Sequence, residues 1–329
     1  MKIFIAGGTG VIGKRVVPIL VEDGHQVGII SRSDKNDFWI NKNGAKPLKS
    51  DLFDINSLRR VGTGYEVFLH LATAIPTKEK PNPMGWGTTM KLRTEGTNNL
   101  IKVAMANNCK LYLQQSNIFV YGHQNGNWVD ESLHLPIPLK NGELYDQNFK
   151  IIVENLREME NIVQENILKG LPAVILRFGW FYSWDSQVFQ DMIMDELSKF
   201  INYDVYWNMV RIDDVAKSIL KTINNYEKIL GKTFNISEPP VNNSLFLNHV
   251  SLRTSGGKIF NIWKDEFLKD KLLQKINNFS SNVRVNSQKA KDMLNWSPEK
   301  NYKEGIQMEI QKFNKEWMKK TKPKGKLDE

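Results

Sequence analysis

A glycine-rich segment near the start of the chain constrains the fold more than any other feature. Gly7, Gly10 and Gly13 stand in the spacing G-x-x-G-x-x-G, directly after the apolar run Lys2–Ala6 and at the head of an amphipathic stretch. The first glycine allows a tight turn, the second lets the backbone approach a pyrophosphate, and the third lets helix and strand pack closely. The helix behind the loop aims free N–H groups at the phosphates. The segment therefore predicts a strand–loop–helix unit that binds a dinucleotide.

Short apolar runs alternate with helical patterns through the first half of the chain. The predicted buried strands are Lys2–Ala6, Gln26–Ser31, Lys46–Lys49, Val67–Leu71, Leu111–Ser116 and Ala173–Phe178. The predicted helices are Ile12–Val21, Asp54–Val61, Thr88–Asn107 and Phe149–Leu168. This alternation predicts an α/β fold of the Rossmann type, a doubly wound parallel sheet with strand order 3-2-1-4-5-6 and its ligand at the carboxyl ends of the strands.

The second half is less regular and predicts a smaller lobe. Residues 1–178 are expected to form the NAD(P)-binding domain, completed over about 205–237 by a strand at Val205–Ile212, a helix at Asp213–Asn224 and a strand at Thr233–Ser237. Residues 179–204 and 238–318 are interpreted as a mostly helical substrate lobe, and 319–329 as a basic, disordered tail. The aromatic residues at the start of this lobe either line a substrate pocket or pack in an ordinary core: Trp180, Phe181, Tyr182 and Trp184.

Composition excludes several classes of function. The chain is 41% hydrophobic and 25% charged, as is usual for a globular protein, and carries a net charge of +9. No apolar run approaches the roughly 18 residues of a membrane span, and no nucleic-acid motif accompanies the basic tail. Histidines and cysteines show no metal-ligand spacing. We therefore expect a small-molecule substrate, with no membrane, nucleic-acid or metal partner, and leave a homodimer open.

Two features favour a cytoplasmic location. Cys109 is the single cysteine, so no internal disulfide forms, which fits a reducing compartment. The glycine loop follows residue 1 so closely that we expect no cleavable targeting peptide before the fold.

The end of the second strand favours NADP(H) over NAD(H). An NAD site usually carries Asp or Glu there, whereas this chain has Ser31 followed by Arg32. Arg32 can grip a 2′-phosphate through a forked, charge-assisted contact. If Arg32 stacks on the adenine or points to solvent instead, NAD(H) stays open. The predicted cofactor-binding residues are Gly7, Thr9, Gly10, Val11, Ile12, Gly13, Ser31, Arg32, Asp51, Leu52, Leu71, Ala72 and Ser116.

Together these residues resemble the extended short-chain dehydrogenase/reductase superfamily, in its epimerase/dehydratase branch. The resemblance covers nearly the whole chain and rests on the order and spacing of short phrases. Beyond the glycine loop and Asp51-Leu52 they are His70-Leu71-Ala72, Gly96-Thr97-Asn98-Asn99-Leu100, Tyr121-Gly122, Asp130-Glu131, Leu171–Arg177, Asp213-Asp214-Val215-Ala216 and Lys289–Pro298. It implies a nicotinamide cofactor and oxidoreductase or epimerase chemistry.

The catalytic residues that the resemblance implies are absent from their usual positions. The family uses Ser or Thr, Tyr and Lys, and the lysine lowers the tyrosine pKa from about 10 so that the phenol can pass a proton. Here Asn117, beside Ser116, stands at the serine position, and the Tyr-x-x-x-Lys positions fall near Ile151 and Asn155. The chain is therefore expected to be an atypical member.

Other residues are candidates for the missing acid. Tyr145 with Lys150 lies just before the usual helix, and His123 follows the strand-five turn. Histidine as a residue type can act as an acid because its ordinary pKa is near neutral. Tyr121 is a weaker candidate that is expected to pack under the cofactor. Asn117 can orient a substrate but supplies no proton.

Three hypotheses for the function follow. The first is an NADP(H)-dependent oxidoreductase or epimerase of the atypical extended type, acting on a small molecule. The second is a non-catalytic NADP(H)-binding regulator. The third is a nucleotide-sugar epimerase or dehydratase with a displaced acid, and the fold alone does not choose among them.

Overall fold

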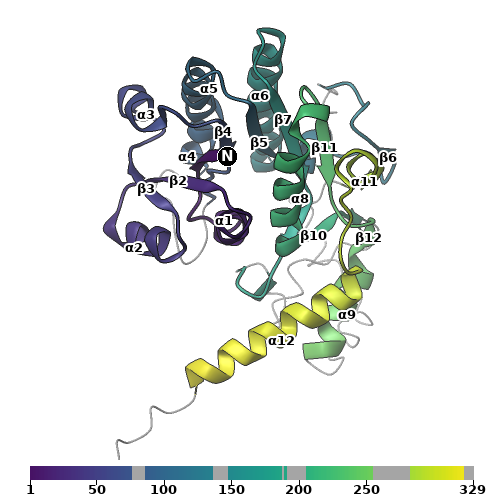
Figure 1. The fold of residues 1–329 in the computed structure, drawn as a ribbon. Helices are drawn as coiled ribbons and strands as arrows, with labels where there is room; N and C mark the ends of the chain where they lie inside the picture. The colour runs from purple at the N-terminus through teal and green to yellow at the C-terminus, as the bar shows by residue number, and fades with distance from the viewer. Residues whose placement is uncertain (76–85, 136–146, 187–188, 191–204, 255–281, 322–329) are drawn as a thin grey trace, which may run out of the picture.

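A parallel sheet forms the centre of the molecule in the computed structural model, which describes residues 1–75, 86–135, 147–186, 189–190, 205–254 and 282–321 (Figure 1). The sheet has seven strands in the order β3-β2-β1-β4-β5-β7-β11. This confirms the predicted order 3-2-1-4-5-6 and adds β11 as a seventh strand at the edge. The strands are β1 (Lys2–Ala6), β2 (Gln26–Ser31), β3 (Lys46–Lys49), β4 (Val67–His70), β5 (Leu111–Asn117), β7 (Ala173–Phe178) and β11 (Thr233–Ile236).

Helices cover both faces of the sheet because alternate strand residues point to opposite sides. Ile3 and Ile5 of β1 pack in one buried cluster with α1 (Gly13–Glu22) and α8 (Ile212–Asn224). Phe4 packs in a second cluster on the other face. The helices on that face are α3 (Ile55–Gly62), α5 (Thr97–Ala106) and α6 (Gln147–Leu168). The expected doubly wound architecture is confirmed.

Helix α2 (Asp34–Lys42) was not predicted from the sequence. Ser33 caps it by accepting a hydrogen bond from the backbone N–H of Asn36, 3.4 Å away, and Asp34 and Asp37 lie in its first turn. Ile40 is its single buried residue, so the stretch lacks the apolar periodicity by which a helix is recognised in a sequence.

The helix predicted over Thr88–Asn107 is present but is not uniform. It consists of α4 (Gly87–Lys91), a π-helical turn η1 (Leu92–Gly96) and α5. The π-helical turn carries Arg93, whose side chain is buried.

The strand predicted at Val205–Ile212 is wrong as a single element, because it is broken at Asn208. Strand β9 (Tyr206–Trp207) pairs with β12 (Val241–Asn242), and β10 (Met209–Arg211) pairs with β8 (Trp180–Tyr182). The Asn208 side chain donates to the carbonyl of Val283 and accepts from the N–H of Val285, both at 2.8 Å. Asn208 thereby joins this chain segment to β13 (Arg284–Val285), which itself pairs with β6 (Trp128–Val129).

A third buried cluster lies outside the central sheet. It gathers Tyr182, Trp207 and Phe246 with Ile306 and Ile310 of α12 (Tyr302–Thr321). The remaining elements of the second half are α9 (Asn243–Thr254), α11 (Gln288–Leu294) and the short helical turn η4 (Tyr226–Lys228), and a further helical turn, η2 (Ile118–Tyr121), follows β5. A buried cluster outside the central sheet fits the predicted substrate lobe, whose bounds remain a prediction.

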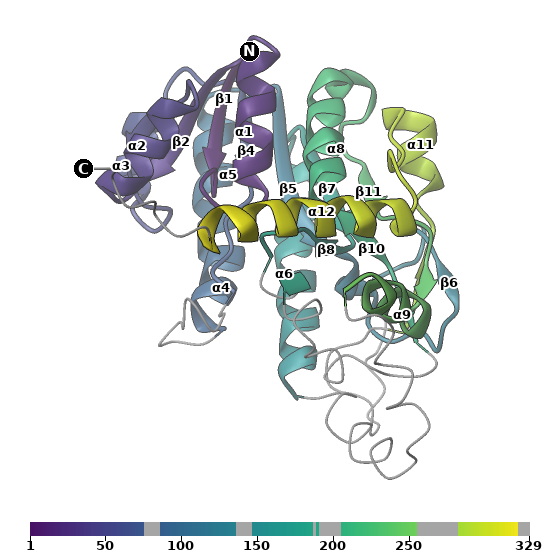
Figure 2. The same ribbon diagram turned by 90° about the horizontal axis from the view of Figure 1, so that it is seen from below.

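Helix α12 runs along the edge of the molecule from which α8 begins (Figures 1 and 2). It extends to Thr321, into the segment expected to be a disordered tail, and residues 322–329 lie outside the described part. Among the described residues, no helix combines the length and the apolar character needed to cross a membrane.

Candidate dinucleotide-binding site

The glycine loop is built as its spacing predicts. Gly7 has a φ of 89°, and a Cβ on it would lie 2.6 Å from the backbone of Leu71 and Ala72. A Cβ on Gly13 would lie 2.2 Å from the carbonyl oxygen of Gly8. Any side chain at either position would collide with backbone, so both glycines are required for the loop to pack against β1 and the end of β4.

Gly10 differs from the other two glycines because it is exposed. Its N–H donates to the carbonyl of Gly7 at 3.0 Å, and its own carbonyl accepts from Lys14 at 2.9 Å. The next residue, Val11, is 51% exposed, whereas Ile12 is buried in the core. The loop, with half-buried Thr9, therefore presents its outer surface at the beginning of α1, where unsatisfied N–H groups favour an anion.

Arg32 and Asp51 meet at the adjacent strand ends. Arg32 Nη1 donates to Asp51 Oδ2 at 3.3 Å, and the Arg32 side chain is 73% exposed. Asp51 Oδ1 also accepts from the N–H of Phe53 at 2.9 Å, while Leu52 is buried. Ser31 is buried and its hydroxyl donates to the carbonyl of Ser33 at 3.2 Å. Arg32 is thus the residue here that is free to turn toward a bound ligand.

A lysine beside this corner was missed from the sequence. Lys49 Nζ forms ion pairs with Asp34 at 3.0 Å and with Asp37 at 2.5 Å. The hydrogen bond from Lys49 lowers the pKa of the Asp37 carboxyl. No sequence spacing marks this contact, because β3 and α2 are brought together by the sheet.

The residues at the predicted serine position serve the turn after β5. Asn117 Oδ1 accepts from the N–H of Phe119 at 2.9 Å and so starts η2. Ser116 is buried, and its hydroxyl donates to Glu160 Oε1 at 2.5 Å. The Ser116 side chain therefore points toward α6, into the interior of the fold.

The helix that should carry Tyr and Lys brings neither to the site within its described residues. Ile151 is 38% exposed, and Asn155 is buried and accepts from Arg93 Nη1 at 3.3 Å. Lys150 is half exposed and lies 3.8 Å from Glu154, one turn further along the same face. Tyr145 lies outside the described residues.

The other two acid candidates are both held by hydrogen bonds. His123 Nδ1 accepts from the backbone N–H of Asn282 at 3.2 Å. Tyr121 is fully buried, its hydroxyl donating to Asn235 Oδ1 and accepting from Arg177 Nη1, both at 2.9 Å. Burial raises the pKa of Tyr121 to about 12, against the lowering effect of Arg177. Tyr121 is therefore placed as a packing residue.

A buried salt bridge lies next to η2, the turn after β5. Arg177 of β7 and Glu160 of α6 approach to 2.6 Å, and their side chains are 7% and 5% exposed. Burial opposes the charge on Arg177, but pairing with Glu160 outweighs it and raises the pKa of Arg177 above its ordinary value. Neighbouring Ser116 and Tyr121 complete the hydrogen bonds of the pair. This pair was missed from the sequence, because its members lie 17 residues apart on α6 and β7 and no local spacing links them.

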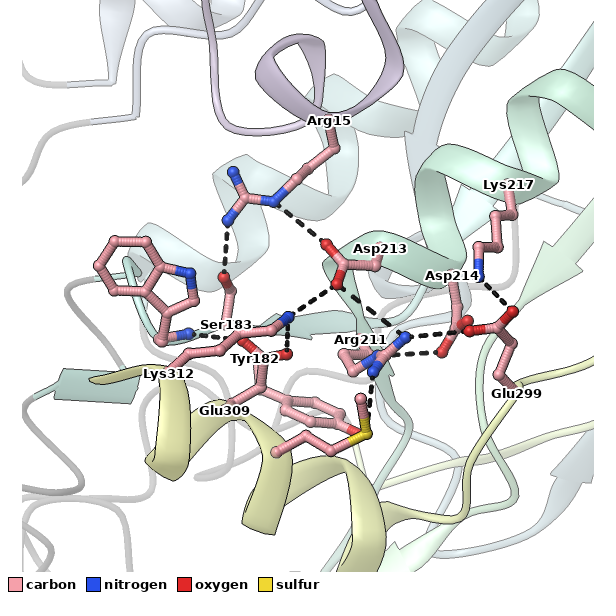
Figure 3. A network of polar contacts seen from close by, with 12 residues as sticks. Arg15, Tyr182, Ser183, Arg211, Asp213, Asp214, Lys217, Glu299, Glu309 and Lys312 are labelled. Carbon is pink, nitrogen blue, oxygen red and sulfur yellow. Dashed lines mark hydrogen bonds and ion pairs between the residues drawn. The ribbon is translucent and has the colours of Figure 1, made fainter. Parts of the chain in front are cut away.

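A second polar network ties α1 to the C-terminal part of the chain (Figure 3). Arg15 lies in the first turn of α1 and pairs with Asp213 at 3.1 Å and with Asp185 at 2.8 Å. Lys312 of α12 reaches the other oxygen of Asp213 at 2.9 Å and Glu309 at the same distance. The helix behind the glycine loop is thus fixed to α8 and α12.

Arg211 is the buried centre of the same network. It lies 3.4 Å from Asp214 and 3.3 Å from Glu299, which also pairs with Lys217.

Within the described part of the chain, no group of three His, Cys, Asp or Glu residues could hold a metal ion.

Comparisons with known proteins agree with this geometry. A sequence profile described as NAD(P)H-binding matches residues 7–226. Two curated relatives are a 3-diazoavenalumate denitrifying reductase from Streptomyces, 28% identical over 188 residues, and a decarboxylating sterol-4-alpha-carboxylate 3-dehydrogenase from Dictyostelium discoideum, 21% identical over 197 residues. Each match covers 55% of this chain and, respectively, 57% and 60% of the relative, so the chain spans little more than half of their length.

Solved structures show the same fold over almost the whole chain. A UDP-glucose 4-epimerase from Thermotoga maritima superposes with a TM-score of 0.73 at 19% identity, covering 96% of this chain and all of the epimerase. A UDP-glucuronic acid 4-epimerase from Bacillus cereus, in complex with NAD, gives 0.71 at 18% identity, with coverage of 96% and 100%. The resemblance noted from the sequence is thereby confirmed. The chain belongs to the NAD(P)H-binding family and has the fold of the epimerase/dehydratase enzymes.

Proposed function

We propose that the protein is an NADP(H)-dependent oxidoreductase that acts on a small molecule. The observation that carries the proposal is the end of β2, where Ser31 is buried and Arg32 is exposed, at the strand end where Rossmann folds bind the adenosine ribose. A carboxylate there would repel a 2′-phosphate, whereas a guanidinium binds it with two parallel hydrogen bonds. To bind the phosphate, the Arg32 side chain has only to break its ion pair with Asp51. Exposed ion pairs of this kind contribute little free energy.

Two observations favour redox chemistry over the rival functions. The two curated relatives described above are named as a reductase and a dehydrogenase, and the epimerases among the fold neighbours described above share under 20% identity. Against catalysis stands the replacement of the family's tyrosine and lysine by Ile151 and Asn155, which keeps a cofactor-binding regulator as the second candidate.

Titration of nicotinamide fluorescence tests the cofactor preference. NADPH should bind more tightly than NADH, and Arg32→Ala should weaken NADPH binding by about 1.5–3 kcal/mol, the range for hydrogen bonds to charged groups. Binding of NADH should hardly change. Arg59→Ala, which removes an exposed arginine from α3, is the matched control. Equal affinities of the wild type for the two cofactors would refute the NADP(H) assignment.

A substrate panel separates the enzyme from the regulator. Aldehydes, ketones, enones and nucleotide sugars are assayed for NADPH oxidation or isomerisation. Turnover of a carbonyl compound supports the oxidoreductase, and turnover of a nucleotide sugar supports the displaced-acid epimerase. Tight NADPH binding without turnover favours the regulator. With a substrate in hand, Tyr145→Phe and then His123→Ala test the source of the proton.

A further inference from the structure

Arg93 is a buried arginine that has no counter-charge among the described residues. It lies on η1, is 7% exposed, and takes part in none of the ion pairs among the described residues. Burial alone lowers its pKa to about 10. Two other buried arginines do have a counter-charge: Arg177 is paired with Glu160, and Arg211 with Asp214. A buried charge that nothing offsets is costly, so its retention calls for a ligand that supplies the missing acceptor.

The guanidinium lies where the carboxyl end of the sheet meets α6. Its Nη1 donates to Asn155 Oδ1 at 3.3 Å, and the Asn155 amide in turn donates to the carbonyl of Met90 at 3.5 Å. Burial lowers the pKa of His70 at the end of β4 to about 4, and the nearby charge of Arg93 adds to this effect. The two residues after His70 contact Gly7 of the glycine loop. Arg93 therefore lies beside the strand ends that a bound dinucleotide crosses.

Arg93 and Asn155 lie at the position where the resemblance places the family's lysine. Asn155 stands where the resemblance places that lysine, and Arg93 reaches it from the π-helical turn of the facing helix. Such turns within α-helices are frequent at functional sites. A guanidinium has five N–H donors, and the contact with Asn155 uses one of them.

We propose that Arg93 takes the place of the family's lysine. Its guanidinium supplies a positive charge beside the nicotinamide and donates hydrogen bonds to an oxygen of the nicotinamide half of the cofactor. The inference rests on the proposed function, because it requires a bound nicotinamide dinucleotide. Asn155 is then a positioning residue that holds the guanidinium through Oδ1.

Calorimetric titration with two ligands tests the assignment. NADPH contains the nicotinamide half, whereas adenosine 2′,5′-bisphosphate contains only the adenine half. Arg93→Met should weaken NADPH binding by about ten- to hundredfold, as expected for hydrogen bonds to a charged group, and leave the bisphosphate unchanged. The ligand-free Arg93→Met protein should melt no lower than the wild type, since the substitution removes an unpaired buried charge. Arg59→Met is the control on an exposed arginine.

A double variant makes the test independent of any single substitution. Arg93→Asn combined with Asn155→Lys moves the cation from η1 to α6 and should recover much of the NADPH affinity that Arg93→Asn alone loses. Wild-type NADPH affinity in Arg93→Met would overturn the inference. Equal weakening of both ligands, or a lower melting temperature without ligand, would also overturn it, because these results indicate a structural arginine. Failure of the wild type to bind NADPH or NADH would instead refute the proposed function.

Discussion

Single glycines of the loop have separate tasks, and the structure distinguishes them. Gly7 is fixed by its positive φ and by the end of β4, and Gly13 by the carbonyl of Gly8. Gly10 is exposed, and a Cβ on it would meet only the Gly7 carbonyl oxygen, at 3.2 Å. Conformation and packing therefore demand the first and third glycines, while the second is where bulk would meet a ligand first.

Gly10→Val should accordingly abolish cofactor binding without unfolding the protein. We expect the affinity for both NADPH and NADH to fall by more than about tenfold, which is a loss of about 1.4 kcal/mol or more. The circular dichroism spectrum should stay that of the wild type. Glu22→Gln, a change to an exposed side chain at the far end of α1, should bind normally. Unchanged NADPH affinity in Gly10→Val would show that the loop is not the phosphate site.

At the scale of the element, helix α6 combines two different surfaces. One presents the exposed residues Lys150 and Glu154, 3.8 Å apart. The other presents Glu160 to Arg177 of β7, where both side chains are almost completely buried. The helix thus carries an exposed and a buried ion pair, which permits an internal comparison.

Glu160→Gln should destabilise the protein far more than Glu154→Gln. The first leaves Arg177 buried without a counter-charge, and we expect the free energy of unfolding to fall by about 3–5 kcal/mol. The second removes an exposed pair and should change it by less than about 1 kcal/mol. Urea denaturation measures both values. Similar small losses in the two variants would mean that the Arg177–Glu160 pair does not hold α6 to the sheet.

At the scale of the whole molecule, charged groups join the nucleotide-binding sheet to the C-terminal part. Glu238, two residues after β11, is 2% exposed and accepts hydrogen bonds from the Tyr182 hydroxyl at 2.7 Å and the Arg211 N–H at 3.2 Å. Burial raises the pKa of Glu238 to about 8, and its proximity to Asp214 raises it further against these hydrogen bonds. At neutral pH this raised pKa favours the protonated form of the Glu238 carboxyl.

This carboxyl should make the stability of the protein depend on pH. Between the unfolded pKa of 4.5 and the folded value of about 8 the native state holds the extra proton, so stability is lost as pH rises through this window. Relative to Glu238→Gln, the wild type should lose at most about 1.4 kcal/mol per pH unit from pH 5 to 8. Urea denaturation at several pH values measures it, with exposed Glu304→Gln as the control. Parallel curves for wild type and Glu238→Gln would contradict the assignment.

The sequence by itself determined the sheet, its strand order and the position of the glycine loop. These follow from local signals, because buried parallel strands are continuous apolar runs and the G-x-x-G-x-x-G spacing meets steric demands within one strand–loop–helix unit. It failed at α2, which buries only Ile40, and at Asn208, which breaks a strand through contacts with residues far along the chain.

Only the tertiary structure decided which polar side chains meet. Arg93 and Asn155 are 62 residues apart, and Arg15 and Asp213 are 198 apart. No periodicity links such pairs, since their contact depends on how strands and helices stack rather than on local spacing. The sequence indicated only that Asn155 stands where the resemblance places the family's lysine. Only the packing of η1 against α6 brings Arg93 beside Asn155 at this position.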